Sequence, residues 1–244
     1  MSEDPTTEGS GTNGALVIAI DGPSGTGKSS VSKAVAKRLQ LSYLDTGAMY
    51  RALAWSCVAC AIDLDDAGSV AQHARTFDLR MGMDPAAPSV GVGDRLIDRE
   101  IREDAVTSVV SRVATNLEVR AIMKQRQRDL IAQGSAATGG CVAEGRDITT
   151  VVAPDAPVRI LMTASEEARM SRRSRQLRVD AESTRSQIVD RDRMDSTVSQ
   201  FTTAADGVVT IDTSHIDFRQ SVAAVLQVVK EVTDGDAKVP TTAG

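Results

Sequence analysis

The chain has 244 residues, which is enough for one sizeable α/β core with small appended subdomains. It carries 28 Lys and Arg against 33 Asp and Glu, a net charge of −5, and only 2% of its residues are aromatic. An acidic chain with so few stacking platforms excludes a nucleic acid polymer as the expected partner, so any small anion must be bound by locally placed arginines.

The cysteines and the apolar runs indicate the cellular compartment of the protein. Cys57, Cys60 and Cys141 are an odd count without a disulfide pattern, which favours a reducing cytoplasm. Cys57 and Cys60 form a C-x-x-C pair on an expected helix, and we interpret them as packing residues rather than a redox or metal site. No apolar run reaches the ~18 residues of a membrane span, and the polar N-terminus is no signal peptide. We expect no membrane partner.

The first elements surround a glycine-rich loop. Residues 1–14 are rich in Ser, Thr, Gly, Glu and Asp and are expected to be disordered. The unbroken apolar run at 15–20 predicts a parallel strand covered on both faces, and a helical pattern follows at about 27–40. The connection fits the phosphate-binding motif G-x-x-x-x-G-K-S, which comprises Gly22, Pro23, Ser24, Gly25, Thr26, Gly27, Lys28, Ser29 and Ser30. The alternative is an ordinary Gly-rich turn between a strand and a helix.

This motif predicts a nucleoside triphosphate as one substrate. Backbone N–H groups of such a loop wrap phosphate oxygens, and the following helix directs its positive end at them. Lys28 is expected to reach the β- and γ-phosphates and to act in catalysis, and Ser29 to ligate Mg²⁺. A nucleoside triphosphate with Mg²⁺ is therefore expected at this loop.

A second informative stretch follows a short expected strand at 41–44. It reads Asp45-Thr46-Gly47-Ala48-Met49-Tyr50-Arg51 and opens a helix, for which Thr46 is the expected N-cap. Arg51 suits bidentate contact with a second phosphate. In the alternative interpretation, Tyr50 is a core residue and Arg51 a solvated surface charge.

The middle of the chain is less regular. Prolines and glycines between 62 and 100 predict a small β-containing insertion with a hairpin at 92–96. Helical patterns follow to residue 131, and 133–140 is expected to be a turn. The next short strand runs into Glu144-Gly145-Arg146-Asp147 at the carboxyl edge of the sheet, where open α/β sheets bind ligands. A surface turn with an ion pair is the alternative there.

The last third carries an arginine-rich helix after an expected strand at 158–163. Five arginines fall within ten residues, and we interpret them as a lid that brings charge to a transferred phosphoryl group, with a solvated surface helix as the alternative. They are Arg169, Arg172, Arg173, Arg175 and Arg178, of which the first three are the best catalytic candidates. A helix at 182–194, a strand at 208–213, a helix at 217–232 and a frayed tail at 234–244 complete the chain.

With these stretches in hand, the chain resembles the bacterial cytidylate kinases (CMP/dCMP kinases), in the P-loop group of nucleoside monophosphate kinases. The particular markers are the Asp45–Arg51 stretch and Glu144-Gly145-Arg146-Asp147-Ile148, and the resemblance runs from about Val17 to Thr213. Two positions differ from the usual family pattern, since Thr149 stands in place of Gly and Val198 in place of Arg.

The resemblance implies an α/β fold of the P-loop NTPase type. Its three-layer αβα core holds a five-stranded parallel sheet. An enlarged nucleotide-monophosphate (NMP) subdomain at about 62–100 and a short lid at about 169–190 complete a single domain at 15–233. It implies transfer of the ATP γ-phosphoryl group to CMP or dCMP by a monomer, as part of pyrimidine metabolism. The residues that would surround the acceptor are Thr46, Tyr50, Arg51, Ser111, Arg120, Arg146, Asp147, Arg191 and Asp195. Arg51 and Arg120 would hold its phosphate; Ser111, Arg146 and Asp147 would read the cytosine edge; Arg191 and Asp195 would bind the sugar.

Three other functions remain open. A shikimate or dephospho-coenzyme A kinase shares the phosphate loop but does not call for the Asp45–Arg51 stretch or the insertion. A GTPase-like switch needs a guanine-reading motif such as Asn-Lys-x-Asp, which the sequence lacks. A kinase-like protein weakened through Val198 would bind nucleotide but turn it over poorly.

Overall fold

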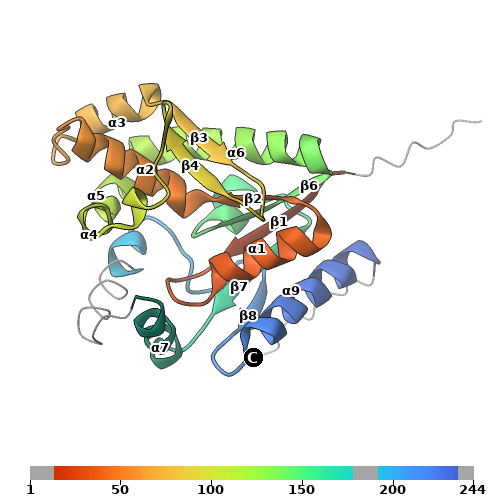
Figure 1. The fold of residues 1–244 in the computed structure, drawn as a ribbon. Helices are drawn as coiled ribbons and strands as arrows, with labels where there is room; N and C mark the ends of the chain where they lie inside the picture. Colours follow the sequence, from red (N-terminus) through yellow and green to blue (C-terminus); the bar gives the residue numbers. More distant parts are fainter. Residues whose placement is uncertain (1–13, 178–191, 236–244) are drawn as a thin grey trace, which may run out of the picture.

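The centre of the molecule is a five-stranded parallel sheet with the order β2-β6-β1-β7-β8 (Figure 1). The computed structural model describes residues 14–177 and 192–235, and for 173–177 it describes the helical backbone alone. The strands are β1 (Leu16–Asp21), β2 (Ser42–Asp45), β6 (Gly140–Gly145), β7 (Val158–Thr163) and β8 (Val209–Asp212). The expected α/β class with five parallel strands is confirmed.

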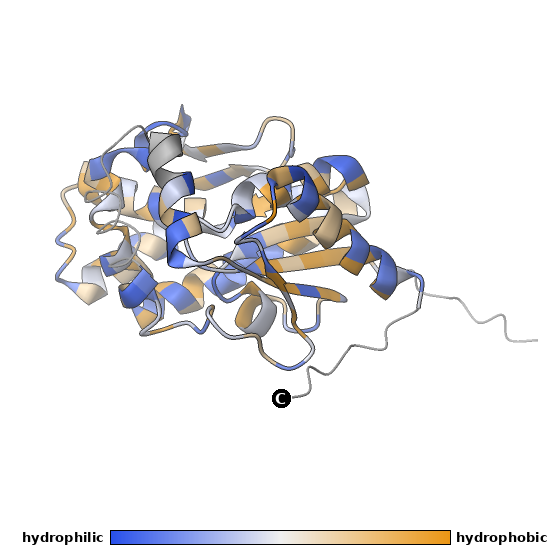
Figure 2. Cartoon of the chain, turned by 90° about the horizontal axis from the view of Figure 1, so that it is seen from below, coloured by the Kyte–Doolittle hydropathy of each residue, from blue (hydrophilic) through white to orange (hydrophobic). Residues whose placement is uncertain are grey.

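Helices cover both faces of this sheet, which explains why its strands are apolar without alternation. One face packs against α1 (Lys28–Leu39) and α9 (Phe218–Thr233), and the other against α2 (Thr46–Ala59) and α6 (Leu117–Thr138). Figure 2 shows the hydrophobic residues gathered on the strands between these helices. The three-layer arrangement places every strand's carboxyl end at one edge of the core.

A smaller unit lies between α2 and α6. It contains α3 (Ala67–Thr76) and an antiparallel sheet of β3 (Leu79–Gly82), β4 (Ser89–Val92) and β5 (Arg95–Leu96). The expected hairpin at 92–96 is confirmed, whereas α3 had no prediction. The short helices η1 (Glu100–Arg102), α4 (Asp104–Thr107) and α5 (Val110–Ala114) lead back to α6. A backbone hydrogen bond from Tyr43 to Met83 (2.9 Å) joins this unit to the edge of the main sheet.

Two local predictions were wrong. The turn expected at 133–140 is the last part of α6, which ends only at Thr138 before Gly139 with φ +81°. The N-cap of α2 is Asp45, whose carboxylate accepts from the Ala48 N–H (2.9 Å), because the Thr46 hydroxyl instead donates to the Glu144 carbonyl (2.7 Å). Thr46 therefore ties β2 to β6 at the edge where the strands end.

Two further elements follow strands of the main sheet, and only the second of them was predicted. The short π-helix η2 (Ile148–Val152) comes after β6, and α7 (Glu166–Leu177) comes after β7. Among the described residues, no helix has the length and apolar character needed to cross a membrane. Residues 1–13 and 236–244 of the expected tails, 178–190 of the expected lid and most of the helix expected at 182–194 lie outside the described residues.

Candidate active site

The phosphate-binding loop connects β1 to α1 as the motif predicts. Gly25 has φ +85°, and a Cβ there would lie 2.9 Å from the Cβ of Arg169, so glycine allows α7 to approach the loop. Gly27 is the N-cap of α1, and among the described residues no side chain caps the helix's first N–H groups. These donors are therefore available to bind an anion.

Lys28 lies beside a buried carboxylate that the sequence analysis did not select. Its Nζ is 3.2 Å from Glu144 Oε2, and the Tyr43 hydroxyl donates to Glu144 Oε1 (2.8 Å). Burial and the adjacent Glu144 charge raise the pKa of Tyr43, so its hydroxyl stays a donor. Burial raises the pKa of Asp45, and the Glu144 charge raises it further. The parallel pairing of β2 with β6 brings Tyr43 and Asp45 beside Glu144, although they are about 100 residues apart in sequence.

A cavity of about 290 Å³ lies between the phosphate-binding loop and residues of α2, β4 and η1. Ser29, Ser30, Arg51 and Arg146 line it, as does Arg102, which had no predicted role. The Arg51 guanidinium donates to the Ile101 carbonyl (3.2 Å) and the Thr107 hydroxyl (3.0 Å). Three arginine side chains therefore converge on one polar cavity from separate elements.

A second group of predicted residues gathers next to this cavity. Arg120 forms an ion pair with Asp147 (2.5 Å) and donates to the Ser199 hydroxyl (2.9 Å). The Ser111 hydroxyl donates to Asp195 Oδ1 (3.3 Å). Burial raises the pKa of Asp147, whereas the Arg120 charge lowers it. Ser199 was not predicted as a site residue; it follows a short helix and turn at 192–198.

The structure groups the arginines differently from the roles expected from the sequence. Arg120 accompanies Asp147 rather than Arg51, and Arg146 lies against the phosphate-binding loop, where it donates to the Ser24 hydroxyl (3.0 Å). Arg146 and Asp147 are adjacent in sequence but contact different partners. Their proximity in the chain is therefore a poor guide to their neighbours in space. Tyr50 is half-buried at the side of the Asp147 group, and burial raises its pKa.

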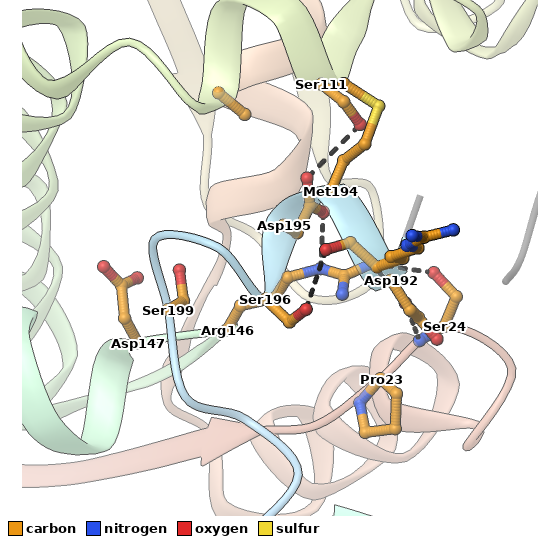
Figure 3. A network of polar contacts seen from close by, with 12 residues as sticks. Pro23, Ser24, Ser111, Arg146, Asp147, Asp192, Met194, Asp195, Ser196 and Ser199 are labelled. Carbon is orange, nitrogen blue, oxygen red and sulfur yellow. Dashed lines mark hydrogen bonds and ion pairs between the residues drawn. The ribbon is translucent and has the colours of Figure 1, made fainter. Parts of the chain in front are cut away.

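Arg146 belongs to a network with two aspartates (Figure 3). Its Nη2 is 2.7 Å from Asp192 Oδ1, and its Nε is 2.9 Å from Asp195 Oδ2. The guanidinium carbon lies 4.3 Å from the centre of the Phe201 ring. These contacts hold Arg146 in one orientation beside the phosphate-binding loop.

The arginines of α7 have unequal positions. Arg169 pairs with Asp192 and donates to the Ser24 carbonyl (3.1 Å). Arg172 donates to the Thr213 hydroxyl (2.9 Å) and carbonyl and to the Thr26 carbonyl (3.3 Å), so it links the loop to the end of β8. Outside the described residues lie the side chains of Arg173 and Arg175 and all of Arg178 and Arg191.

Another cavity opens on the opposite side of the phosphate-binding loop. Its walls are the loop itself, α7 and the connection from β8 to α9, including Arg172, His215 and Phe218. The sequence analysis selected neither His215 nor Phe218. A lone histidine before an expected helix carries no motif, and it is the fold that brings His215 to the loop.

Comparison with known proteins gives consistent results. A family model described as cytidylate kinase matches residues 18–231. The cytidylate kinases of Streptomyces avermitilis and Streptomyces coelicolor are each 46% identical, over 89% and 91% of this chain and 94% and 95% of their own. That of Cutibacterium acnes is 44% identical over 88% of this chain and 96% of its own. A crystal structure of an uncharacterized protein from Eubacterium ventriosum, 12% identical, has a TM-score of 0.50 over 88% of this chain and 98% of its own, a likeness of fold alone.

Proposed function

The chain belongs to the cytidylate kinase family, and from this premise we infer that it transfers the γ-phosphoryl group of ATP to CMP or dCMP. The observation that supports this most is the single cavity shared by Lys28 of the phosphate-binding loop and Arg51 of the NMP side. One cavity with cations at both ends can hold donor and acceptor phosphates in line. A small-metabolite kinase is not favoured, because the relatives at 44–46% identity are cytidylate kinases.

We propose that ATP lies across the phosphate-binding loop. Its phosphates would take the loop N–H groups and Lys28, which would leave Glu144 and turn to the β- and γ-phosphates. Its nucleoside would occupy the cavity lined by His215 and Phe218, where the phenyl ring offers an apolar surface.

CMP is proposed to occupy the other end of the main cavity. Arg51 and Arg102 would hold its phosphate, with Thr46 and Tyr50 at the same helix start. Ser111, Arg120 and Asp147 would read the cytosine edge, since they combine a hydroxyl, a guanidinium donor and a carboxylate acceptor next to the cavity. Asp195, with Arg191, stays proposed for the sugar. In this proposal Arg120 moves from the acceptor phosphate to the cytosine edge, and Arg146 moves from the cytosine edge to the transferred phosphoryl group.

The chemistry asks these residues for alignment and charge neutralisation. An oxygen of the CMP phosphate attacks the γ-phosphorus, and the bond from that phosphorus to the β–γ bridging oxygen breaks. Lys28, Arg146 and Arg169 are the cations best situated for the charge on the moving group, and one such arginine can be worth ~10³ in rate. Arg172 is proposed to hold the loop in place, and Arg173 remains a candidate from the sequence. The scheme needs no general base, and exclusion of water limits hydrolysis.

The residues present suit Mg²⁺. The Ser29 hydroxyl lines the main cavity together with the carboxylates of Asp45 and Glu144, which is a hard-oxygen donor set. Mg²⁺ in kinases keeps several waters and is held largely by substrate phosphates, so a dedicated protein cage is not required. We propose Ser29 as its protein ligand; the ion would neutralise charge on the β- and γ-phosphates. A monomer in the cytoplasm remains part of this proposal.

Replacement of Lys28 tests the assignment of the loop. We expect Lys28→Ala to lower turnover with ATP and CMP by ~10³ or more, because it removes the cation that the loop itself brings to the β- and γ-phosphates. Lys37→Ala is the matched control, since Lys37 is an exposed lysine on the same helix, outside the cavity with Lys28. Near-normal turnover of Lys28→Ala in a coupled ADP-release assay would contradict the assignment.

A further inference from the structure

Asp192 is bound by an unusual set of donors. Its Oδ1 accepts from the backbone N–H of Ser24 (3.3 Å) and lies 2.7 Å from Arg146 Nη2 (Figure 3). Its Oδ2 pairs with Arg169 Nη1. The three side chains are largely buried, with exposed fractions of 13–15%. One carboxylate therefore contacts an amide of the phosphate-binding loop and two arginines at once.

These same donors are suited to a phosphoryl group. Loop N–H groups and paired guanidinium groups are what proteins use to bind phosphate oxygens. A carboxylate has the right charge sign but only two oxygens and one negative charge, so it satisfies the site incompletely. Arg146 Nη1 and Arg169 Nε are in fact buried without a hydrogen-bond partner in the described part of the chain. Two buried, unpaired donors next to the same carboxylate indicate a site that suits a larger anion with more oxygens.

We propose that Asp192 is an internal substitute for a phosphoryl group, which keeps Arg146 and Arg169 paired until phosphate displaces it. This rests on the proposed function, in which both arginines face the transferred group. The carboxylate prevents two neighbouring guanidinium groups from being buried with uncompensated charge. The need to displace it lowers the apparent affinity for phosphates, because binding must exchange one set of charged hydrogen bonds for another.

Replacement of Asp192 by phosphate should leave both arginines in their present orientation. Arg146 is held on its other side by Asp195 (2.9 Å) and by the face of Phe201, so it stays in place when Asp192 leaves. Arg169 keeps its hydrogen bond to the Ser24 carbonyl. Asp192 is thus a positioning residue that presents both arginines already oriented, and phosphate takes over contacts that are already formed.

Binding of inorganic tripolyphosphate tests the proposal. The probe has no base or sugar and is titrated calorimetrically without Mg²⁺, so the result does not depend on whether CMP is the true acceptor. We expect Asp192→Asn to lower the tripolyphosphate Kd about tenfold, because a neutral amide competes poorly for the guanidinium groups. Asp192→Glu, which retains the charge, should bind close to the unmodified protein.

Two further variants separate competition from net charge. Asp155→Asn makes the same charge change at an exposed residue before β7, at the opposite end of that strand from the site, and should leave the Kd unchanged. Asp195→Asn removes the negative charge that pairs with Arg146 but leaves Asp192 in contact with Ser24 and Arg169. It should therefore increase the affinity for tripolyphosphate less than Asp192→Asn does. Equal gains for Asp192→Asn and Asp195→Asn, or an unchanged or weaker Kd for Asp192→Asn, would overturn the proposal. If Asp192→Asn does not fold, Asp192→Ser is titrated in the same way. It also removes the carboxylate, so the same decrease in Kd is expected and an unchanged Kd would overturn the proposal.

Discussion

At the scale of single residues, buried carboxylates organise the site. Asp21, at the end of β1, is almost fully buried and accepts from the N–H groups of Ile148 (2.9 Å) and Thr149 (2.8 Å) and from the Thr149 hydroxyl (2.6 Å). Because Arg146 and Asp147 immediately precede these donors, Asp21 fixes the loop that carries both. Thr149, which differs from the family pattern, turns its hydroxyl to Asp21 and adds a third hydrogen bond there.

Asp21 predicts a measurable pH dependence of stability. Burial raises its pKa from 3.8 to about 6, against the opposing effect of its hydrogen bonds. A pKa raised in the folded state gives stability that is fully present below about pH 4 and is lost as the pH rises through about 6. We expect this contribution to reach about 3 kcal/mol. It should appear as a steeper fall in unfolding free energy between about pH 4 and about pH 6.5 for the unmodified protein than for Asp21→Asn.

The control is Asp155→Asn, an exposed carboxylate that should leave the slope unchanged. Parallel pH profiles for Asp21→Asn and the unmodified protein would show that folding does not raise the pKa of Asp21, contrary to this account.

At the scale of elements, α6 shows where local sequence patterns mislead. Three glycines, Gly134, Gly139 and Gly140, fall between residues 133 and 140, and glycine is a common helix breaker, so the pattern predicts a turn. In the structure Gly134 lies in the helix interior, where its carbonyl accepts from the Ser42 hydroxyl (3.1 Å) and a Cβ would lie 2.8 Å from Ser42 Cβ. Glycine there allows close packing of α6 on β2, which no local pattern reveals.

This packing makes a prediction opposite in sign to helix propensity. In an exposed helix, Gly→Ala stabilises by about 1 kcal/mol. At Gly134 the added methyl group meets Ser42 Cβ, and we expect a net loss of about 1–3 kcal/mol in unfolding free energy, measured by denaturant titration. Ala132→Gly, at an exposed position of the same helix, measures the effect of helix propensity alone. Stabilisation by Gly134→Ala would show that α6 and β2 separate easily.

At the scale of the whole molecule, the parts predicted from sequence are those with local signals. The strand–loop–helix around Lys28 and the apolar strands at 15–20 and 158–163 were predictable because motif and hydrophobic pattern agree. The second half of the site was only partly predictable. The order in which distant strands pair brings Glu144 beside Lys28, and it places His215 and the phosphate-binding loop around one cavity. Such contacts depend on topology, so the roles now proposed for Arg120 and Arg146 required the fold.

The most direct test of the central claim is a coupled ADP-release assay with Mg²⁺-ATP and alternative acceptors. The acceptors are CMP, dCMP, UMP, AMP, shikimate and none. We predict strong turnover with CMP and dCMP and little ADP release without acceptor, because Ser111, Arg120 and Asp147 suit the cytosine edge. Turnover with another acceptor alone, or ADP release that is independent of any acceptor, would contradict the account.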